Sequence, residues 1–190
     1  IEIISRLSND GEYKTIHDVW RKHKSLNVAH GAICSSELKR TLRLQWEKQN
    51  EWDHQAFGFD INETKRAKGL AKNNPNCKAI FPLLFYGMGK KDCINQLQES
   101  EITLPEPYAL GFNNNNCFQT GCIQGGIGYW KKIQRDFPDK FEAMAAIEHE
   151  LTNAKHKPVT ICKDQSLAAK ETGEQLVFLK PHPDYPSTKT

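Results

Sequence analysis

Apolar residues recur at the spacing of one helix face in several segments of the chain. In the first segment, Ile16, Val19 and Trp20 lie at i, i+3 and i+4 and predict a helix that begins at about residue 15. The same kind of pattern predicts further helices at about residues 36–50, 62–73, 90–99, 122–135 and 138–152. Either Ser35 or Ser36 can cap the helix at 36–50, because a serine hydroxyl accepts a hydrogen bond from a first-turn N–H.

Two short apolar runs lie between these helices and predict strands, at Gln55 to Phe59 and Lys78 to Phe81. The second strand is expected to end near its last residue, because Pro82 cannot donate a ladder hydrogen bond. Asn62 follows the first run and can cap the next helix. Strands that alternate with helices predict an α/β fold, with a sheet flanked by helices.

The pattern also suggests a division of the chain. Residues 1–152 are expected to form the α/β domain, and residues 153–190 a C-terminal extension. The extension contains two strand-like runs, Val159 to Cys162 and Leu176 to Leu179, and then a proline-rich tail.

Composition narrows the class of protein. Charged residues make up 26% and hydrophobic residues 38% of the 190 positions, as in ordinary soluble domains. No apolar run approaches the roughly 20 residues of a membrane-spanning helix, so no membrane partner is expected. The chain has no signal-peptide pattern, which predicts a cytoplasmic protein, and it begins with Ile1, so we expect it to start within a longer sequence.

Basic residues are clustered although the net charge is only +3. The clusters are Lys39, Arg40 and Arg43; Lys65, Arg66 and Lys68; Lys90 and Lys91; and Lys131, Lys132 and Arg135. They are typical of solvated helix surfaces, and anion binding at two or more of them is the alternative. A net charge this small does not by itself indicate a nucleic-acid-binding protein.

Six cysteines without a secretory signal favour metal ligation or free thiols over a disulfide framework. Cys117 and Cys122 have four residues between them and are flanked by Asn and Gly, which suits a loop that wraps a metal or cluster. Two thiols cannot complete four-coordination. Cys34 and Cys93 are the candidate partners because each begins a predicted helix, where the helix dipole favours a thiolate. The alternative for either is a small buried hydrophobic residue.

Weaker candidates lie beside these thiols. Gly125 and Gly126 could bring backbone N–H groups close to a phosphate at a helix start, although the aromatic residues that follow them indicate packing instead. His30 precedes Cys34 by four residues and is a candidate acid or ligand, but a lone histidine is more often a surface or core residue.

Several motifs now carry a family resemblance, between about Ala32 and Leu151. The first motif is Ile33–Lys39, with its cysteine before a basic helix, and the second is Gly58–Arg66, with its Gly-hydrophobic-x-x-x-Glu-x-x-Arg turn. The third is Phe81–Leu83 together with Lys91–Cys93. These motifs resemble segments of the phosphoadenosine-phosphosulfate (PAPS) reductase-like family, of bacterial or phage type. This family belongs to the PP-loop ATP-pyrophosphatase (adenine nucleotide alpha hydrolase-like) superfamily.

The resemblance implies a Rossmann-like (HUP-type) sheet with flanking helices, incomplete at its N-terminus, and a helical C-terminal part that bears the cysteines. It also implies a [4Fe-4S] cluster held by four cysteines, which here are Cys34, Cys93, Cys117 and Cys122. Their spacing departs from the Cys-Cys…Cys-x-x-Cys pattern of the reductases. The cluster, zinc and free-thiol interpretations therefore all stay open.

The resemblance further implies an adenine nucleotide or sulfonucleotide, ATP or PAPS, as ligand. The family binds it with a Ser-Gly-Gly-x-[Asp/Lys]-Ser loop that is absent from this sequence, so family chemistry needs a PP-loop from outside this chain. We expect Lys39, Glu63 and Arg66, with Asn62, to line one cleft at the carboxyl ends of the strands, with Glu63 orienting Arg66 toward an anion.

Three functions follow from these observations. The first is an enzyme, an oxidoreductase or sulfurtransferase that performs nucleotide-dependent sulfur chemistry. The second is a nucleic-acid-modifying or nucleic-acid-binding component, like the related DNA phosphorothioation sulfurtransferases. The third is a non-catalytic, metal-stabilised module. Nucleic acid and a second copy of the chain are the macromolecular partners that these functions suggest.

Overall fold

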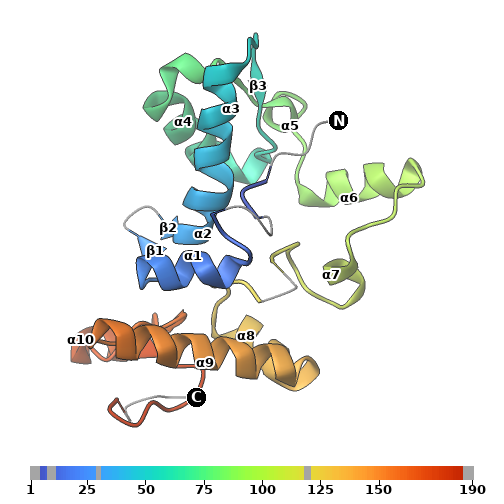
Figure 1. Cartoon of the computed structure of the whole chain (residues 1–190). Coiled ribbons are helices and arrows are strands. Elements are labelled where there is room, and N and C mark those ends of the chain that lie inside the picture. Colours follow the sequence, from blue (N-terminus) through green and yellow to red (C-terminus); the bar gives the residue numbers. More distant parts are fainter. Residues whose placement is uncertain (1–4, 8–11, 29–30, 118–120, 186–190) are drawn as a thin grey trace. The chain divides into compact units, whose positions relative to one another are not determined.

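The computed structural model describes residues 5–7, 12–28, 31–117 and 121–185 (Figure 1). His30 lies outside the described residues. The chain forms two compact units: unit 1 contains residues 1–46 and 114–190, and unit 2 contains residues 47–113. Both helices and strands occur, so the fold is mixed α/β, as predicted. No helix in the described part of the chain has the length and apolar character needed to cross a membrane.

Unit 1 begins with the predicted first helix, α1 (Ile16–His23). Thr15 caps it, and the Asp18 carboxylate accepts hydrogen bonds from the Thr15 N–H at 2.8 Å and hydroxyl at 3.0 Å. An antiparallel pair, β1 (Asn27–Val28) and β2 (Gly31–Ala32), leads into a continuous helical segment. This segment consists of α2 (Ile33–Ser35), a π-helical turn (Ser36–Arg40) and α3 (Thr41–Gln49).

The serine caps predicted for this segment are wrong. Ser35 and Ser36 both have helical backbone angles, and Ala32 is the residue at which the chain enters the helix. The Ile33 N–H donates instead to the Leu26 carbonyl at 3.1 Å. A first-turn donor is thus satisfied by backbone across the β1–β2 connection, so the helix needs no side-chain cap there.

Helices α8 (Ile127–Asp136) and α9 (Pro138–Lys155) lie side by side in unit 1 (Figure 1). Pro138 occupies the first turn of α9, as predicted. The α8 helix begins about five residues later than predicted, because residues 122–125 form a turn closed by the Gly125 N–H and the Cys122 carbonyl at 2.8 Å. Trp130, Ile133 and Met144 are at most 2% exposed, and they form part of the core.

Residues after 152, expected to form an extension, belong to unit 1. They contain β5 (Cys162–Lys163), α10 (Leu167–Thr172) and β6 (Leu176–Val177), and the two strands pair antiparallel. The strands are shorter than predicted because a side chain of α9 accepts hydrogen bonds from backbone N–H groups of the residues expected to form them. Glu148 of α9 is fully buried and accepts hydrogen bonds from the N–H groups of Ile161 at 2.5 Å and Leu179 at 2.6 Å.

Unit 2 contains both strands predicted for the sheet. β3 (Gln55–Ala56) and β4 (Ala79–Ile80) pair in parallel, and Pro82 begins the short helix α5 (Pro82–Phe85) directly after them. The other helices of this unit are α4 (Thr64–Asn73), α6 (Lys90–Glu99), α7 (Glu106–Ala109) and 3₁₀ turns at Ile61–Glu63 and Pro75–Cys77.

Asn62 does not cap the helix that follows β3. Asp60 has the extended backbone of an N-cap, and its carboxylate accepts the Asn62 N–H at 2.8 Å. Glu63 accepts the Asp60 N–H at 3.4 Å in return. This reciprocal pair satisfies two first-turn donors at once, which a cap at Asn62 could not do.

Candidate functional site

Three of the four predicted thiols line one cavity in unit 1. Cys34, Cys117 and Cys122 share this cavity of about 400 Å³ with Lys39. The volume is within the range of small-molecule sites, so there is room for a ligand beside the thiols. Apolar residues, Trp20 among them, complete its wall.

A tight loop holds Cys122 at the cavity. Gly121 has a left-handed backbone, with φ of 78°, and a Cβ atom added to it would lie 2.4 Å from the Trp130 ring. Gly125 is equally confined, because an added Cβ would lie 2.2 Å from the Tyr129 ring. The Tyr129 hydroxyl accepts the Cys122 N–H at 3.1 Å. The two glycines let the loop lie directly on the aromatic side chains of α8.

A hydrogen bond between the thiols of Cys117 and Cys122 is the largest influence on the pKa of each. The bond from Cys122 and the positive charge of Lys39 lower the pKa of Cys117 to about 6, against the effect of burial. Donating this hydrogen bond, together with burial, raises the pKa of Cys122 far above its ordinary range. A negative charge on the pair is therefore favoured on Cys117 and disfavoured on Cys122.

Cys34 is the third thiol of this cavity. Burial raises the pKa of its thiol, the Trp20 indole N–H opposes that rise, and a charge on Cys117 adds to it. Trp20 is 1% exposed, and its Nε1 has no regular hydrogen-bond acceptor among the described residues. A buried indole N–H normally has an acceptor, so an anionic sulfur or ligand in the cavity would satisfy it.

The donor set fits a soft metal or an iron–sulfur cluster, which both prefer thiolates. In the described part of the chain, no three His, Cys, Asp or Glu side chains already surround one point at metal-binding distance. The thiols line a common wall without closing on a centre. Cys93 lies in the first half of α6, in unit 2, and its convergence with the other three thiols stays a prediction.

The predicted anion-binding residues are divided between the units. In unit 2, Arg66 donates to Glu63, as predicted, and its guanidinium carbon lies 4.9 Å from the centre of the Phe59 ring. Lys39 belongs to unit 1, so the cleft expected to join them stays a prediction. Gly126 is the N-cap of α8, with open space around it, and its contact with a phosphate also stays a prediction.

Sequence reasoning missed two contributors to this site. Trp20 was recognised only as part of an apolar helix stripe, although a buried indole N–H is itself a sign that an acceptor is needed. The aromatic residues after Gly126 were expected to pack, and the Tyr129 ring does pack against the loop. Its hydroxyl in addition accepts a hydrogen bond from the Cys122 backbone N–H. No local pattern in the sequence distinguishes that second role.

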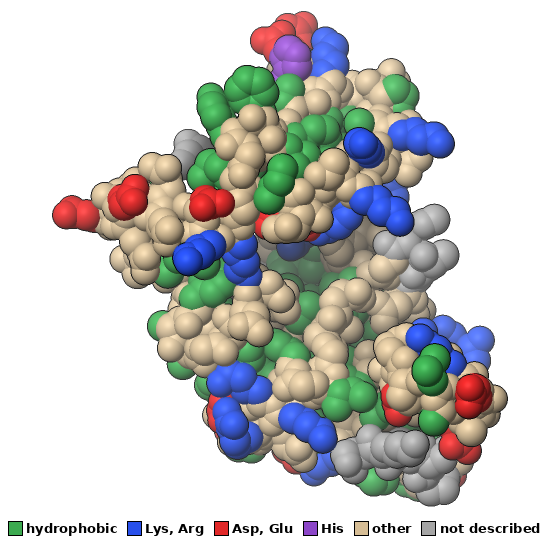
Figure 2. All heavy atoms as spheres, turned by 180° about the vertical axis from the view of Figure 1, so that it is seen from behind, with side chains coloured by type: hydrophobic (Ala, Val, Ile, Leu, Met, Phe, Trp, Pro, Cys, Tyr) green, Lys and Arg blue, Asp and Glu red, His purple; other side chains and the backbone are tan. Residues whose placement is uncertain are grey.

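Lysine and arginine side chains are spread over the face shown in Figure 2, among acidic and apolar ones. Comparison of the chain with protein-family models, curated proteins and solved structures gives no match. The family resemblance therefore rests on the local motifs alone.

Proposed function

We propose that this chain carries a thiolate-bound metal centre of a PAPS reductase-like protein, and that Cys34, Cys117 and Cys122 are its ligands in unit 1. Cys93 is proposed as the fourth ligand. The observation that carries the proposal is that Cys34 and the Cys117–Cys122 pair, which is distant from it in sequence, line one cavity beside a lysine. Thiolates repel one another unless a cation neutralises them, so such a grouping favours metal binding.

The centre proposed is a [4Fe-4S] cluster, with zinc as the alternative. When bound, an iron–sulfur cluster would supply electron transfer or an iron site for sulfur, whereas a zinc ion held by four cysteines would neutralise the thiolates and stabilise the fold. Lys39 would attract an anionic substrate to the cavity, and Trp20 would donate its free N–H to an anionic sulfur. Both features suit sulfonucleotide reduction or ATP-dependent sulfur transfer.

The finer fold proposed with this function is a Rossmann-like sheet. The parallel pairing of β3 with β4 supports it, since parallel strands are the elements of such sheets. The nucleotide, PAPS or ATP, would be held by a PP-loop outside this chain, and Arg66 of unit 2 would meet one of its anionic groups.

The test is anaerobic purification followed by an absorption spectrum and by iron, sulfide and zinc analysis. We expect bound metal in the wild type and its loss in C34S, C117S and C122S. C162A is the matched control, because Cys162 is buried in the same unit but does not line this cavity. Metal-free protein from anaerobic cells, or equal metal content in all variants, would contradict the proposal.

Two further measurements separate the parts of the proposal. Loss of metal in C93S would assign the fourth ligand, whereas retention would exclude Cys93. Titration of the metal-loaded protein with PAPS and with a non-hydrolysable ATP analogue tests the substrate class, and we expect K39M to weaken the binding of either anion. Unchanged binding in K39M would remove Lys39 from the substrate site.

A further inference from the structure

The helical segment that carries Cys34 and Lys39 contains one widened turn. The backbone N–H and the Oγ1 hydroxyl of Thr41 both donate to the Ser36 carbonyl, the hydroxyl at 3.0 Å. This turn closes over five residues instead of four, a feature often found at functional sites. In a regular α-helix, residues five apart point about 140° away from each other. Here Cys34 and Lys39 line one cavity, and Lys39 lies within the wide turn.

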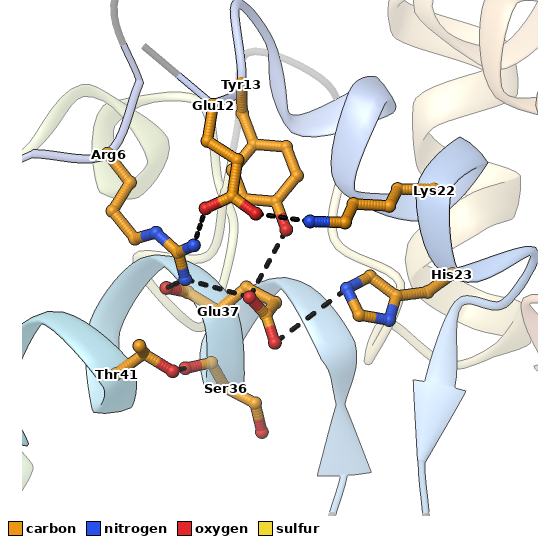
Figure 3. Close-up of polar contacts among 8 residues, drawn as sticks. All are labelled: Arg6, Glu12, Tyr13, Lys22, His23, Ser36, Glu37 and Thr41. Atoms are coloured by element: carbon orange, nitrogen blue, oxygen red, sulfur yellow. Dashed lines mark hydrogen bonds and ion pairs between the residues drawn. The ribbon is translucent and has the colours of Figure 1, made fainter.

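Arg6, Tyr13 and His23, which precede this turn in the chain, contact Glu37 within it (Figure 3). Arg6 Nη1 donates to the Glu37 carboxylate at 2.8 Å and to the Glu37 backbone carbonyl at 3.2 Å. The Tyr13 hydroxyl donates to the same carboxylate at 3.3 Å, and His23 Nε2 lies 3.8 Å from its other oxygen. Glu37 is thus contacted from three directions, while its neighbour Ser36 accepts the wide-turn bonds.

Shielding makes the Arg6–Glu37 pair stronger than an ordinary surface ion pair. The side chains are 15% and 20% exposed, respectively, and charges screened less by water attract each other more. Arg6 also bonds Glu12, which in turn bonds Lys22 (Figure 3). Glu12 is 41% exposed, and its ion pairs are with these two basic residues and not with the wide turn.

We propose that Arg6 and Glu37 form a clamp that sets the wide turn and so positions Lys39 beside Cys117, drawing anionic ligands to this thiol. Arg6 and Glu37 are positioning residues, because they contact the helix and not the cavity. The inference deepens the proposed function by giving the same site a preference for anions. It does not depend on a metal, since Lys39 and Cys117 belong to this chain.

The test compares alkylation of Cys117 by iodoacetate, an anion, and by iodoacetamide, its neutral analogue. Reduced, metal-free protein is treated with each reagent, and peptide mass spectrometry gives the two rates for this exposed thiol. One unit charge within several ångströms in a watery environment changes the rate ratio by about threefold. We expect K39M to lower the iodoacetate-to-iodoacetamide ratio by that factor, because it removes the cation itself.

If the clamp positions Lys39, R6K and E37Q lower the ratio as K39M does, while E150Q, which removes an ion pair with Arg21 that involves neither Arg6 nor Glu37, keeps the wild-type ratio. R6K retains the charge but lacks the planar guanidinium, which places Nη1 on Glu37 while Nη2 pairs with Glu12. Wild-type ratios in R6K and E37Q, both folded by circular dichroism, would overturn the proposal. Unfolding of both variants would overturn it too, because the pair would then hold the whole unit and not the turn. Neither outcome bears on metal content, which tests the proposed function separately.

Discussion

Replacing Glu148 with glutamine should change how the stability of the protein depends on pH. The Glu148 carboxyl is fully buried in α9 and accepts hydrogen bonds from two backbone N–H groups, those of Ile161 and Leu179. Burial raises the pKa of Glu148 from 4.5 to about 7, although both hydrogen bonds act in the opposite direction. The free-energy cost of removing the carboxylate charge from water therefore exceeds the stabilisation that the two N–H donors give to that charge.

The sign and size of the effect follow from this raised pKa. Between pH 4.5 and about 7 the folded protein holds a proton on Glu148 that the unfolded chain has released, so stability is highest below pH 4.5 and falls as pH rises through this window. The difference between the two pKa values corresponds to about 3 kcal/mol. Glutamine does not ionise. Its amide NH₂ group would face one of the two backbone N–H donors, which would leave that donor without an acceptor and lower the free energy of unfolding by about 1–3 kcal/mol at every pH.

Urea unfolding at several pH values between 4 and 8 measures this difference directly. We expect the free energy of unfolding of the wild type to fall across the window by about 3 kcal/mol more than that of E148Q. E150Q is the matched control, because Glu150 lies on the same helix in an exposed pair with Arg21, whose hydrogen bond lowers the pKa of Glu150. Parallel pH profiles for wild type and E148Q would refute the argument.

Two further predictions concern the thiols and the loop. In reduced, metal-free protein, iodoacetamide should label Cys117 with a midpoint near pH 6, while Cys162, the pKa of which burial raises to about 12, stays unlabelled in the folded state; equal labelling of both thiols at pH 7 would contradict this. G121A should destabilise the protein by more than about 1 kcal/mol, because it combines a left-handed backbone with a clash against Trp130. G128A, in open space within α8, should instead stabilise it by about 0.5–1 kcal/mol. Thermal unfolding of both variants checks the contrast, and equal shifts would show that Gly121 has no special role.

The Cys117–Cys122 loop could be predicted in part. The sequence indicated a loop that brings these two thiols together, and in the structure both of them line one cavity. It did not indicate where the next helix begins, because that depends on how closely Gly121 and Gly125 approach the rings of α8. Such an approach involves side-chain volume, and not a repeating pattern of apolar residues.

The helix that carries Lys39 shows the same division. The helical spacing of its apolar residues predicted its position at about residues 36–50. The widened turn inside it was not, because such a turn has no periodic signal of its own. The turn is contacted through Glu37 by Arg6, which lies 31 residues from Glu37 along the chain.

The sequence by itself predicted the longer helices, the places of the two strands in unit 2 and which cysteines to consider, because these depend on local spacing, proline positions and residue type. Only the tertiary structure decided which of these residues share a cavity, that Glu148 is buried beneath the C-terminal strands, and that the Trp20 N–H is free. Burial and charge depend on distances between segments far apart in the chain, and a sequence pattern records those distances only indirectly.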